Sequence, residues 1–185
     1  MPAAANRVRI IGGIWRSRIV RFPAREDLRP TPDRVRETLF NWLGQDLTGK
    51  ACLDLFAGSG ALGFEAASRG AARVVMLERD AVAFRALQEN ARLLAADTLD
   101  LRRADALEFL RADGGRYDVV FIDPPFRSDL LPQVLPLLPP HLAPGALVHV
   151  ESPRPPDLPA QWEVLRSGRA GAVNHQLLKW TDHET

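Results

Sequence analysis

A-C-L-D-L-F-A-G-S-G-A-L-G, residues 51–63, is the stretch from which the fold of this chain can be inferred. It opens as a short apolar strand that carries a single acid, Asp54, near its end. A glycine turn from Gly58 to Gly60 follows, and small and apolar residues then begin a helix. A strand that enters a helix through a glycine turn is the first βα unit of a nucleotide-binding α/β fold. The N–H groups at the start of such a helix are free to bind a ligand.

Two kinds of nucleotide fit this turn. Gly58 to Gly63 form a literal G-x-G-x-x-G, the fingerprint of dinucleotide binding, and Glu78 follows fifteen residues after the last glycine. Asp54 argues against a dinucleotide such as NAD, because its carboxylate would repel a pyrophosphate resting on the helix N-terminus. A carboxylate at this point suits a ligand that carries a cationic ammonium group.

The pattern D-x-F-x-G-x-G, which begins at Asp54, resembles the first motif of the class I S-adenosylmethionine (SAM) methyltransferases. The resemblance implies that SAM is the cofactor. Glu78 ends the next expected strand, residues 73–77, where a carboxylate accepts hydrogen bonds from ribose hydroxyls. Asp105 either accepts from the adenine amino group, as in these enzymes, or only caps the helix that follows it. The residues assigned to the cofactor are Asp54, Phe56, Ala57, Gly58, Ser59, Gly60, Glu78, Arg79, Asp105 and Ala106.

A second motif follows residues 117–122, Y-D-V-V-F-I, an apolar run typical of a parallel strand that is buried on both faces. This strand leads directly into Asp123, Pro124, Pro125 and Phe126. The two prolines stiffen the backbone and provide no N–H, so an acid, a rigid carbonyl and an aromatic ring form a slot for a flat base that bears an amine. The alternative is a plain strand exit with a phenylalanine in the core. D-P-P-F resembles the catalytic motif of methyltransferases that act on exocyclic amines of bases, so these four residues are the catalytic candidates.

Length and composition fit one α/β domain: the chain has 185 residues, of which 46% are hydrophobic and 25% are charged. No apolar run approaches the roughly 20 residues that a membrane span needs, and the N-terminus lacks the apolar region of a signal peptide. The single cysteine and the four scattered histidines predict neither a disulfide nor a metal site. We therefore expect a cytoplasmic protein without a metal.

The N-terminal part is basic, since residues 1–50 hold ten Lys+Arg against five Asp+Glu. Over residues 7–22 basic and apolar residues alternate about the pair Gly12-Gly13, which predicts a β-hairpin with an arginine-rich face. These arginines either contact the phosphates of a polyanionic partner or are merely solvated. The candidates for RNA contact are Arg7, Arg9, Arg16, Arg18 and Arg21.

Helices are expected over residues 33–43 and 128–138. For the first, Thr31 is the predicted N-cap and Pro32 the first helical residue. Its apolar stripe would face the core, which leaves Arg36 on the solvated side.

Two N-terminal stretches are similar to the signature of the bacterial RsmD family. They are R-I-I-G-G-I-W-R-S-R, from Arg9, and D-L-R-P-T-P-D-R-V-R-E-T-L-F-N-W-L, from Asp27. Enzymes of this family methylate the exocyclic N2 of a guanine in small-subunit (16S) ribosomal RNA. Together with the two motifs above, the resemblance covers residues 7–152. It implies the same activity here, places Arg29 and Thr31 next to the cofactor, and makes ribosomal RNA within a small-subunit assembly particle the partner.

The expected fold is a doubly wound, Rossmann-like α/β domain with a seven-stranded mixed sheet, acting as a monomer. The single domain 1–185 divides into a basic arm (1–30), a leading helix (31–44), a SAM-binding and catalytic core (51–152) and a C-terminal antiparallel hairpin (160–180). Two rival functions stay open: an adenine-N6 methyltransferase on RNA or DNA, and a non-catalytic RNA-binding assembly factor. The RsmD signature favours guanine N2, and the intact set of Asp54, Glu78 and Asp123 argues against an idle factor.

Overall fold

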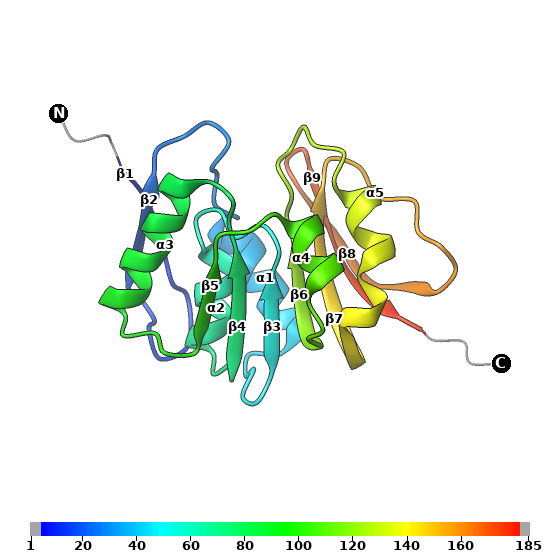
Figure 1. Cartoon of the computed structure of the whole chain (residues 1–185), viewed down its shortest axis with the longest axis horizontal. Coiled ribbons are helices and arrows are strands. Elements are labelled where there is room, and N and C mark those ends of the chain that lie inside the picture. Colours follow the sequence, from blue (N-terminus) through cyan, green and yellow to red (C-terminus); the bar gives the residue numbers. More distant parts are fainter. Residues whose placement is uncertain (1–4, 182–185) are drawn as a thin grey trace.

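The computed structural model describes residues 5–181, which form a seven-stranded sheet with helices on both faces and a separate N-terminal hairpin (Figure 1). The strand order is β5-β4-β3-β6-β7-β9-β8. The first five strands in this order are parallel, and β9 runs antiparallel to both of its neighbours. The predicted doubly wound mixed sheet is confirmed. Its strands are β3 (Ala51–Asp54), β4 (Arg73–Leu77), β5 (Leu99–Arg102), β6 (Tyr117–Ile122), β7 (Leu142–Ser152), β8 (Trp162–Ala170) and β9 (Val173–Trp180).

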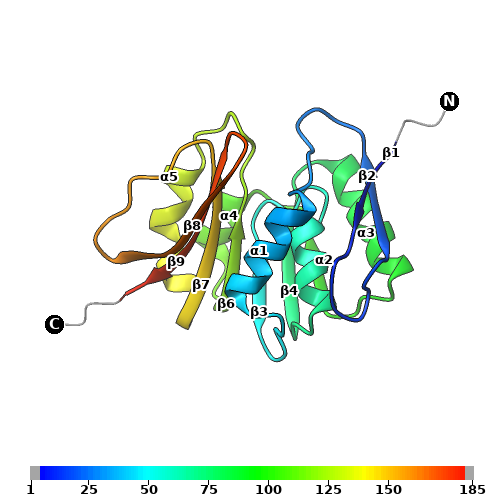
Figure 2. The ribbon, with the colours of Figure 1, turned by 180° about the vertical axis from the view of Figure 1, so that it is seen from behind.

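The helices divide between two cores. One face of the sheet packs against α1, α2 and α3 together with the hairpin, and the other packs against α4 and α5 (Figures 1 and 2). The central strands are apolar throughout because successive residues serve opposite cores: Cys52 faces the first and Leu53 the second, and both are fully buried. The helices are α1 (Asp33–Leu43), α2 (Ala61–Ser68), α3 (Ala81–Leu93), α4 (Ala106–Ala112) and α5 (Leu131–Val134).

The N-terminal hairpin consists of β1 (Ala5–Arg9) and β2 (Ile19–Pro23), which pair antiparallel with Val8 opposite Val20. Both valines are buried in the first core, so the hairpin is part of the packed body. The predicted hairpin is confirmed, but its glycine pair does not form a tight turn between the strands. Gly13, at φ +79°, lies so close to α2 that a Cβ would stand 1.9 Å from the carbonyl oxygen of Ser68. The pair therefore docks the connection between β1 and β2 onto the end of α2.

Two helical predictions need correction. Helix α1 begins at Asp33 with Pro32 at the N-cap position and no side-chain cap, so Thr31 does not have the predicted capping role. The helix predicted over residues 128–138 is short: α5 ends at Val134 and a single 3₁₀ turn, Leu135–Leu137, follows. Pro136 explains this, because it lies within the predicted helix and has no N–H to donate to the carbonyl of Pro132. Nowhere in residues 5–181 does a helix have the length and apolar character to cross a membrane.

Candidate active site

Three carboxylates meet at the carboxyl edge of the sheet, where the strand order reverses between β3 and β6. Asp54, Phe121 and His149 lie level with one another on β3, β6 and β7. Asp123 lies two residues after Phe121, and Glu151 lies two residues after His149. Because side chains alternate along a strand, both acids are on the same face of the sheet as Asp54 and lie beyond it at the carboxyl edge. In Figure 1 this is the upper edge, above which the segments 23–32 and 123–130 form two loops. Such a switch point is where open α/β sheets bind their ligands.

The three carboxylates perturb one another. Burial raises the pKa of Asp54 from 3.8 to about 7, although the N–H groups of Phe56 and Gly63 stabilise its charge. Burial raises the pKa of Asp123 well above its ordinary value, and the nearby charges of Glu151 and Asp54 raise it further. The pKa of Glu151 is likewise raised to about 7, mainly by burial. A cationic ligand would relieve both the desolvation and the repulsion. Within residues 5–181 these acids are not part of any cluster suited to holding a metal ion.

Glu78 braces the glycine turn from the end of β4. Its carboxylate accepts a hydrogen bond from the N–H of Gly58 at 3.0 Å and another from the N–H of Asp80 at 2.9 Å. Gly60 is held at φ +84°, and a Cβ there would collide with Phe64 at 2.5 Å, so only glycine fits both the backbone and the packing. The turn and Glu78 thus form one rigid unit beside Asp54.

Asp105 caps α4, the second of its two predicted roles. Its Oδ1 accepts hydrogen bonds from the N–H groups of Leu107 at 3.0 Å and Glu108 at 3.1 Å. No hydrogen bond to Oδ2 is formed within the described part of the chain, so a ligand can still approach that oxygen. Ala106 is buried behind Asp105, and Arg79, after β4, is exposed.

The D-P-P-F turn projects from the sheet edge as a stiff loop. The carbonyl of Pro125 accepts hydrogen bonds from both the N–H and the hydroxyl of Ser128, at 2.9 and 2.7 Å, and these fix the turn. Asp123 and Pro124 are half-buried, whereas Phe126 is 58% exposed. The alternative that Phe126 is a core residue is wrong. Its ring is open to solvent at the edge of the sheet.

Thr31 joins the N-terminal segment to the carboxylate cluster, a contact that sequence reasoning missed. Its hydroxyl donates a hydrogen bond to Oε1 of Glu151 at 3.1 Å, and both side chains are buried. Arg29, two residues earlier, is exposed. The threonine–proline pair before α1 gave only a capping signal, and nothing in the local pattern indicated a partner 120 residues away.

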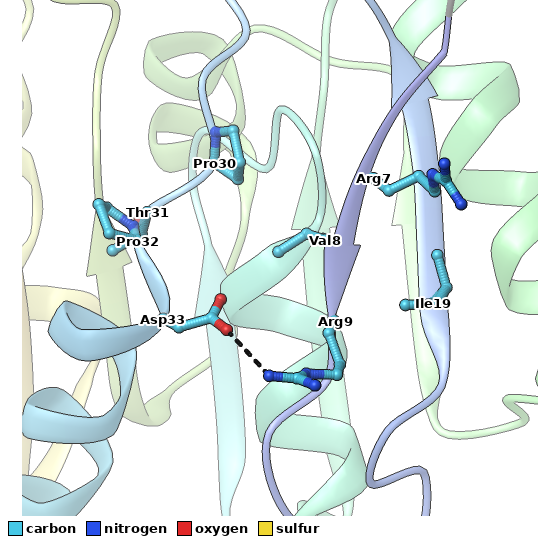
Figure 3. Close-up of a pocket in the computed structure, with 8 residues that line it drawn as sticks. All are labelled: Arg7, Val8, Arg9, Ile19, Pro30, Thr31, Pro32 and Asp33. Carbon is cyan, nitrogen blue, oxygen red and sulfur yellow. Dashed lines mark ion pairs between the residues drawn. The ribbon is translucent and has the colours of Figure 1, made fainter.

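A pocket of about 420 Å³ lies between the hairpin and the segment that leads into α1. Figure 3 shows Arg9 directing its guanidinium at Asp33, to which it forms an ion pair of 3.7 Å, and Arg7 pointing away from Asp33. Thr31 also lines this pocket, which therefore lies next to the carboxylate cluster. The pocket is lined by Arg7, Val8, Arg9, Ile19, Pro30, Thr31, Pro32 and Asp33.

The five candidate arginines are all exposed but do not share one face. Arg7 lies opposite Arg21 in the hairpin. Arg9 occupies the equivalent alternate position of β1, but its guanidinium turns toward Asp33 whereas that of Arg7 points away. Arg16 and Arg18 lie instead in the connection between β1 and β2, where Arg18 donates a hydrogen bond to the carbonyl of Leu93 at 3.3 Å. Trp15, beside them, is buried.

A buried ion network, which the sequence did not reveal, holds the arm in place. Arg36 is fully buried, contrary to its predicted position on a solvated face, and pairs with Glu65 of α2 at 3.1 Å. Glu65 also pairs with Arg69 at 2.9 Å and accepts hydrogen bonds from the N–H groups of Ile11 and Gly12. The network ties α1, α2 and the hairpin connection together. The local signals for it were the i,i+4 spacing of Glu65 and Arg69 and the i,i+3 spacing of Asp33 and Arg36, which also form an ion pair.

The chain is similar to known proteins over nearly its whole length. Residues 8–179 match the family model described as conserved hypothetical protein 95. The chain is 43% identical over 180 residues to ribosomal RNA small subunit methyltransferase D of Escherichia coli strain K12, covering 95% of this chain and 91% of that protein. It is 41% identical over 184 residues to the protein of the same name from Haemophilus influenzae, covering 95% of each. The structure of the Escherichia coli protein yhhF, 44% identical, aligns with a TM-score of 0.84 over 95% of this chain and 99% of that one. The chain therefore belongs to the ribosomal RNA small subunit methyltransferase D family.

Proposed function

We propose that this protein transfers a methyl group from SAM to the exocyclic N2 of a guanine in small-subunit ribosomal RNA. The observation that supports this most strongly is the cluster of Asp54, Asp123 and Glu151 at the switch point, beside the D-P-P-F turn. Burial raises the pKa values of these acids, and a cofactor whose ammonium group lies beside Asp54 would favour the ionised form of that carboxyl. The names of the close relatives support ribosomal RNA as the substrate.

The residues present fit the cofactor. Asp54 would hold the ammonium group, Glu78 the ribose hydroxyls, and the open oxygen of Asp105 the adenine amino group. The backbone of the glycine turn and Phe56 would border the cofactor, with Arg79, Ala106, Arg29 and Thr31 around it. When bound, SAM supplies a methyl group made electrophilic by the sulfonium.

Asp123 and Pro124 would prepare the nucleophile. The N2 lone pair of guanine is delocalised into the ring, so the nitrogen attacks only once it becomes pyramidal. The Asp123 carboxylate and the Pro124 carbonyl can accept the two amine hydrogens and favour that geometry. With SAM bound, the nitrogen would take its methyl group as the C–S bond breaks and the electron pair stays on sulfur. Asp123 or water would then take one proton from the methylated nitrogen, and S-adenosylhomocysteine would be the second product. Orienting the two reactants contributes about 7–11 kcal/mol in favourable cases.

The target base must leave its stack to reach this slot, at a cost of a few kcal/mol. Phe126 offers a ring on which the displaced base can stack. The exposed arginines of the hairpin would contact phosphates next to the pocket that leads to Thr31. We infer a single-domain, monomeric enzyme that acts in the cytoplasm on a partly assembled small subunit.

Two measurements test this function. Calorimetry should show micromolar binding of S-adenosylhomocysteine and no binding of NAD, and the reverse would reject the cofactor assignment.

Tritium from methyl-labelled SAM should enter small subunits that lack the modification, and should not enter large subunits. Asp123→Ala, which removes the proposed proton acceptor, is the negative control. Equal labelling of both subunits would reject small-subunit RNA as the specific substrate.

A further inference from the structure

Glu151 is the acid of the cluster that neither sequence motif contains. It lies near the end of β7, one residue after Val150, which pairs with Ile122 at the end of β6. Asp123 directly follows Ile122, so continuing this register puts Glu151 and Asp123 side by side on the same face of the sheet. Adjacent strands lie about 4.8 Å apart, so a base held by Asp123 also comes within reach of Glu151. The charge of Glu151 contributes to the raised pKa of Asp123, which is consistent with this proximity.

The two oxygens of Glu151 differ in their surroundings. Oε1 accepts the hydrogen bond from Thr31 at 3.1 Å, whereas Oε2 forms no hydrogen bond with any part of the chain that the structure describes. Glu151 is only 8% exposed, and no arginine, lysine or histidine forms an ion pair with it among residues 5–181. A buried carboxylate without a cationic partner is costly. Thr31 fixes the group with one oxygen still able to accept a hydrogen bond from a ligand.

We propose that Glu151 selects guanine by accepting the hydrogen bond of the base N1–H, while Asp123 and Pro124 hold the N2 amine. This inference rests on the proposed function. The Watson–Crick edge of guanine presents the N1–H and the N2 amine side by side, and two neighbouring carboxylates can accept from both. Adenine has an unprotonated N1, whose lone pair would face Oε2 and be repelled by it. A site built to accept a particular N–H rejects analogues that lack it by about 10⁴–10⁵-fold in favourable cases. Thr31 would act as a positioning residue for this contact.

The base 2-aminopurine tests the N1 contact directly, because it keeps the 2-amine and has no N1–H. Small subunits would be assembled from 16S RNA ligated to carry guanine or 2-aminopurine at the modified position. We expect the native enzyme to prefer guanine by about 10³-fold or more in kcat/KM. Glu151→Gln should narrow this preference by at least about tenfold, because its amide can donate to the bare N1. The missing O6 of 2-aminopurine affects both enzymes alike, so the change in the ratio reports the N1 contact.

Controls separate this role from others. Glu163→Gln, at an exposed position of β8, should leave the preference unchanged. Affinity for S-adenosylhomocysteine should stay within about threefold of the native value in Glu151→Gln, and thermal melting should confirm that the variant folds. Glu151→Asp keeps the negative charge on a side chain that is one methylene shorter, so its carboxylate should no longer reach the base and kcat/KM for guanine should fall. This variant gives a second test if Glu151→Gln is unstable.

The possible outcomes are distinct. An unchanged preference in Glu151→Gln would overturn the inference, and so would a loss of cofactor affinity with the preference intact, because Glu151 would then be a cofactor ligand. If the native enzyme methylates adenine instead of guanine, the proposed function itself fails. If it methylates guanine and only the variant result is negative, the function stands and the role of Glu151 is refuted.

Discussion

Asp54→Asn is expected to stabilise the free protein and at the same time to weaken its binding of the cofactor. Asp54 is 2% exposed, and burial raises its pKa from 3.8 to about 7. A difference of this size corresponds to about 4 kcal/mol of instability when the carboxylate is ionised. Asparagine keeps an oxygen that can accept from the N–H groups of Phe56 and Gly63, although a neutral acceptor holds them less tightly. We therefore expect a net stabilisation of about 2 kcal/mol at pH 8.

The effect should depend on pH in a defined direction. The folded protein binds the Asp54 proton more tightly than the unfolded chain does, so ionisation of this group destabilises the fold. The contribution of Asp54 to the free energy of unfolding is most favourable below pH 3.8. It falls as the pH rises from 3.8 to about 7 and is constant at higher pH. The gain in the free energy of unfolding that Asp54→Asn brings over the native protein should therefore be large at pH 8 and small at pH 4.

Thermal melting of the free proteins measures the first effect. About 2 kcal/mol corresponds to a rise in Tm of about 4–8 °C for a chain of this size. Titration with S-adenosylhomocysteine measures the second, since losing a hydrogen bond to a charged group costs about 1.5–3 kcal/mol, or one to two decades in Kd. Asp157→Asn, at an exposed position, is the matched control and should change neither quantity. A variant with native Tm and native affinity would refute both the burial of an ionised Asp54 and its role as a cofactor ligand.

Three further variants test other parts of the site. Asp123→Ala should keep its affinity for S-adenosylhomocysteine in calorimetry while kcat falls by about 10²–10⁴-fold, and near-native turnover would make the D-P-P-F turn purely structural. Phe126→Ala should raise KM for the ribosomal particle by about 10–100-fold without lowering Tm, because an exposed stacking ring is lost; an unchanged KM would exclude stacking. Replacing Arg7 and Arg21 together by alanine should reduce the slope of log affinity for RNA against log salt by about 1–2, and an unaltered slope would mean that these arginines are only solvated.

The central βα unit and the D-P-P-F turn could be predicted from the sequence because their signals are local. An apolar strand, a glycine turn and a helix start are adjacent in the chain, and the paired prolines fix the turn after β6 without help from elsewhere. The contacts that were missed are all between distant segments. Arg36 looked solvated by helical periodicity, yet it is buried because Glu65 lies opposite it on α2. Likewise, the local sequence predicted that Thr31 caps α1, whereas its hydroxyl donates a hydrogen bond to the distant Glu151.

The N-terminal arm shows the same limit. Alternation correctly predicted the hairpin, but the two-residue period could not reveal that the glycine pair docks on α2 or that Val8 and Val20 join the main core. Removing the hairpin would therefore expose apolar surface as well as delete arginines. Replacing exposed arginines of the hairpin, such as Arg7 and Arg21, is therefore a better test of RNA binding than deleting the hairpin.

The most direct test of the central claim is the identity of the methylated nucleoside. Small subunits that lack the modification are incubated with the protein and methyl-labelled SAM, and their RNA is digested to nucleosides for mass spectrometry. Asp123→Ala serves as the blank. We expect the label in N2-methylguanosine at a single site. Label in N6-methyladenosine, or no label in the presence of bound cofactor, would contradict the assignment of this protein as a guanine-N2 methyltransferase.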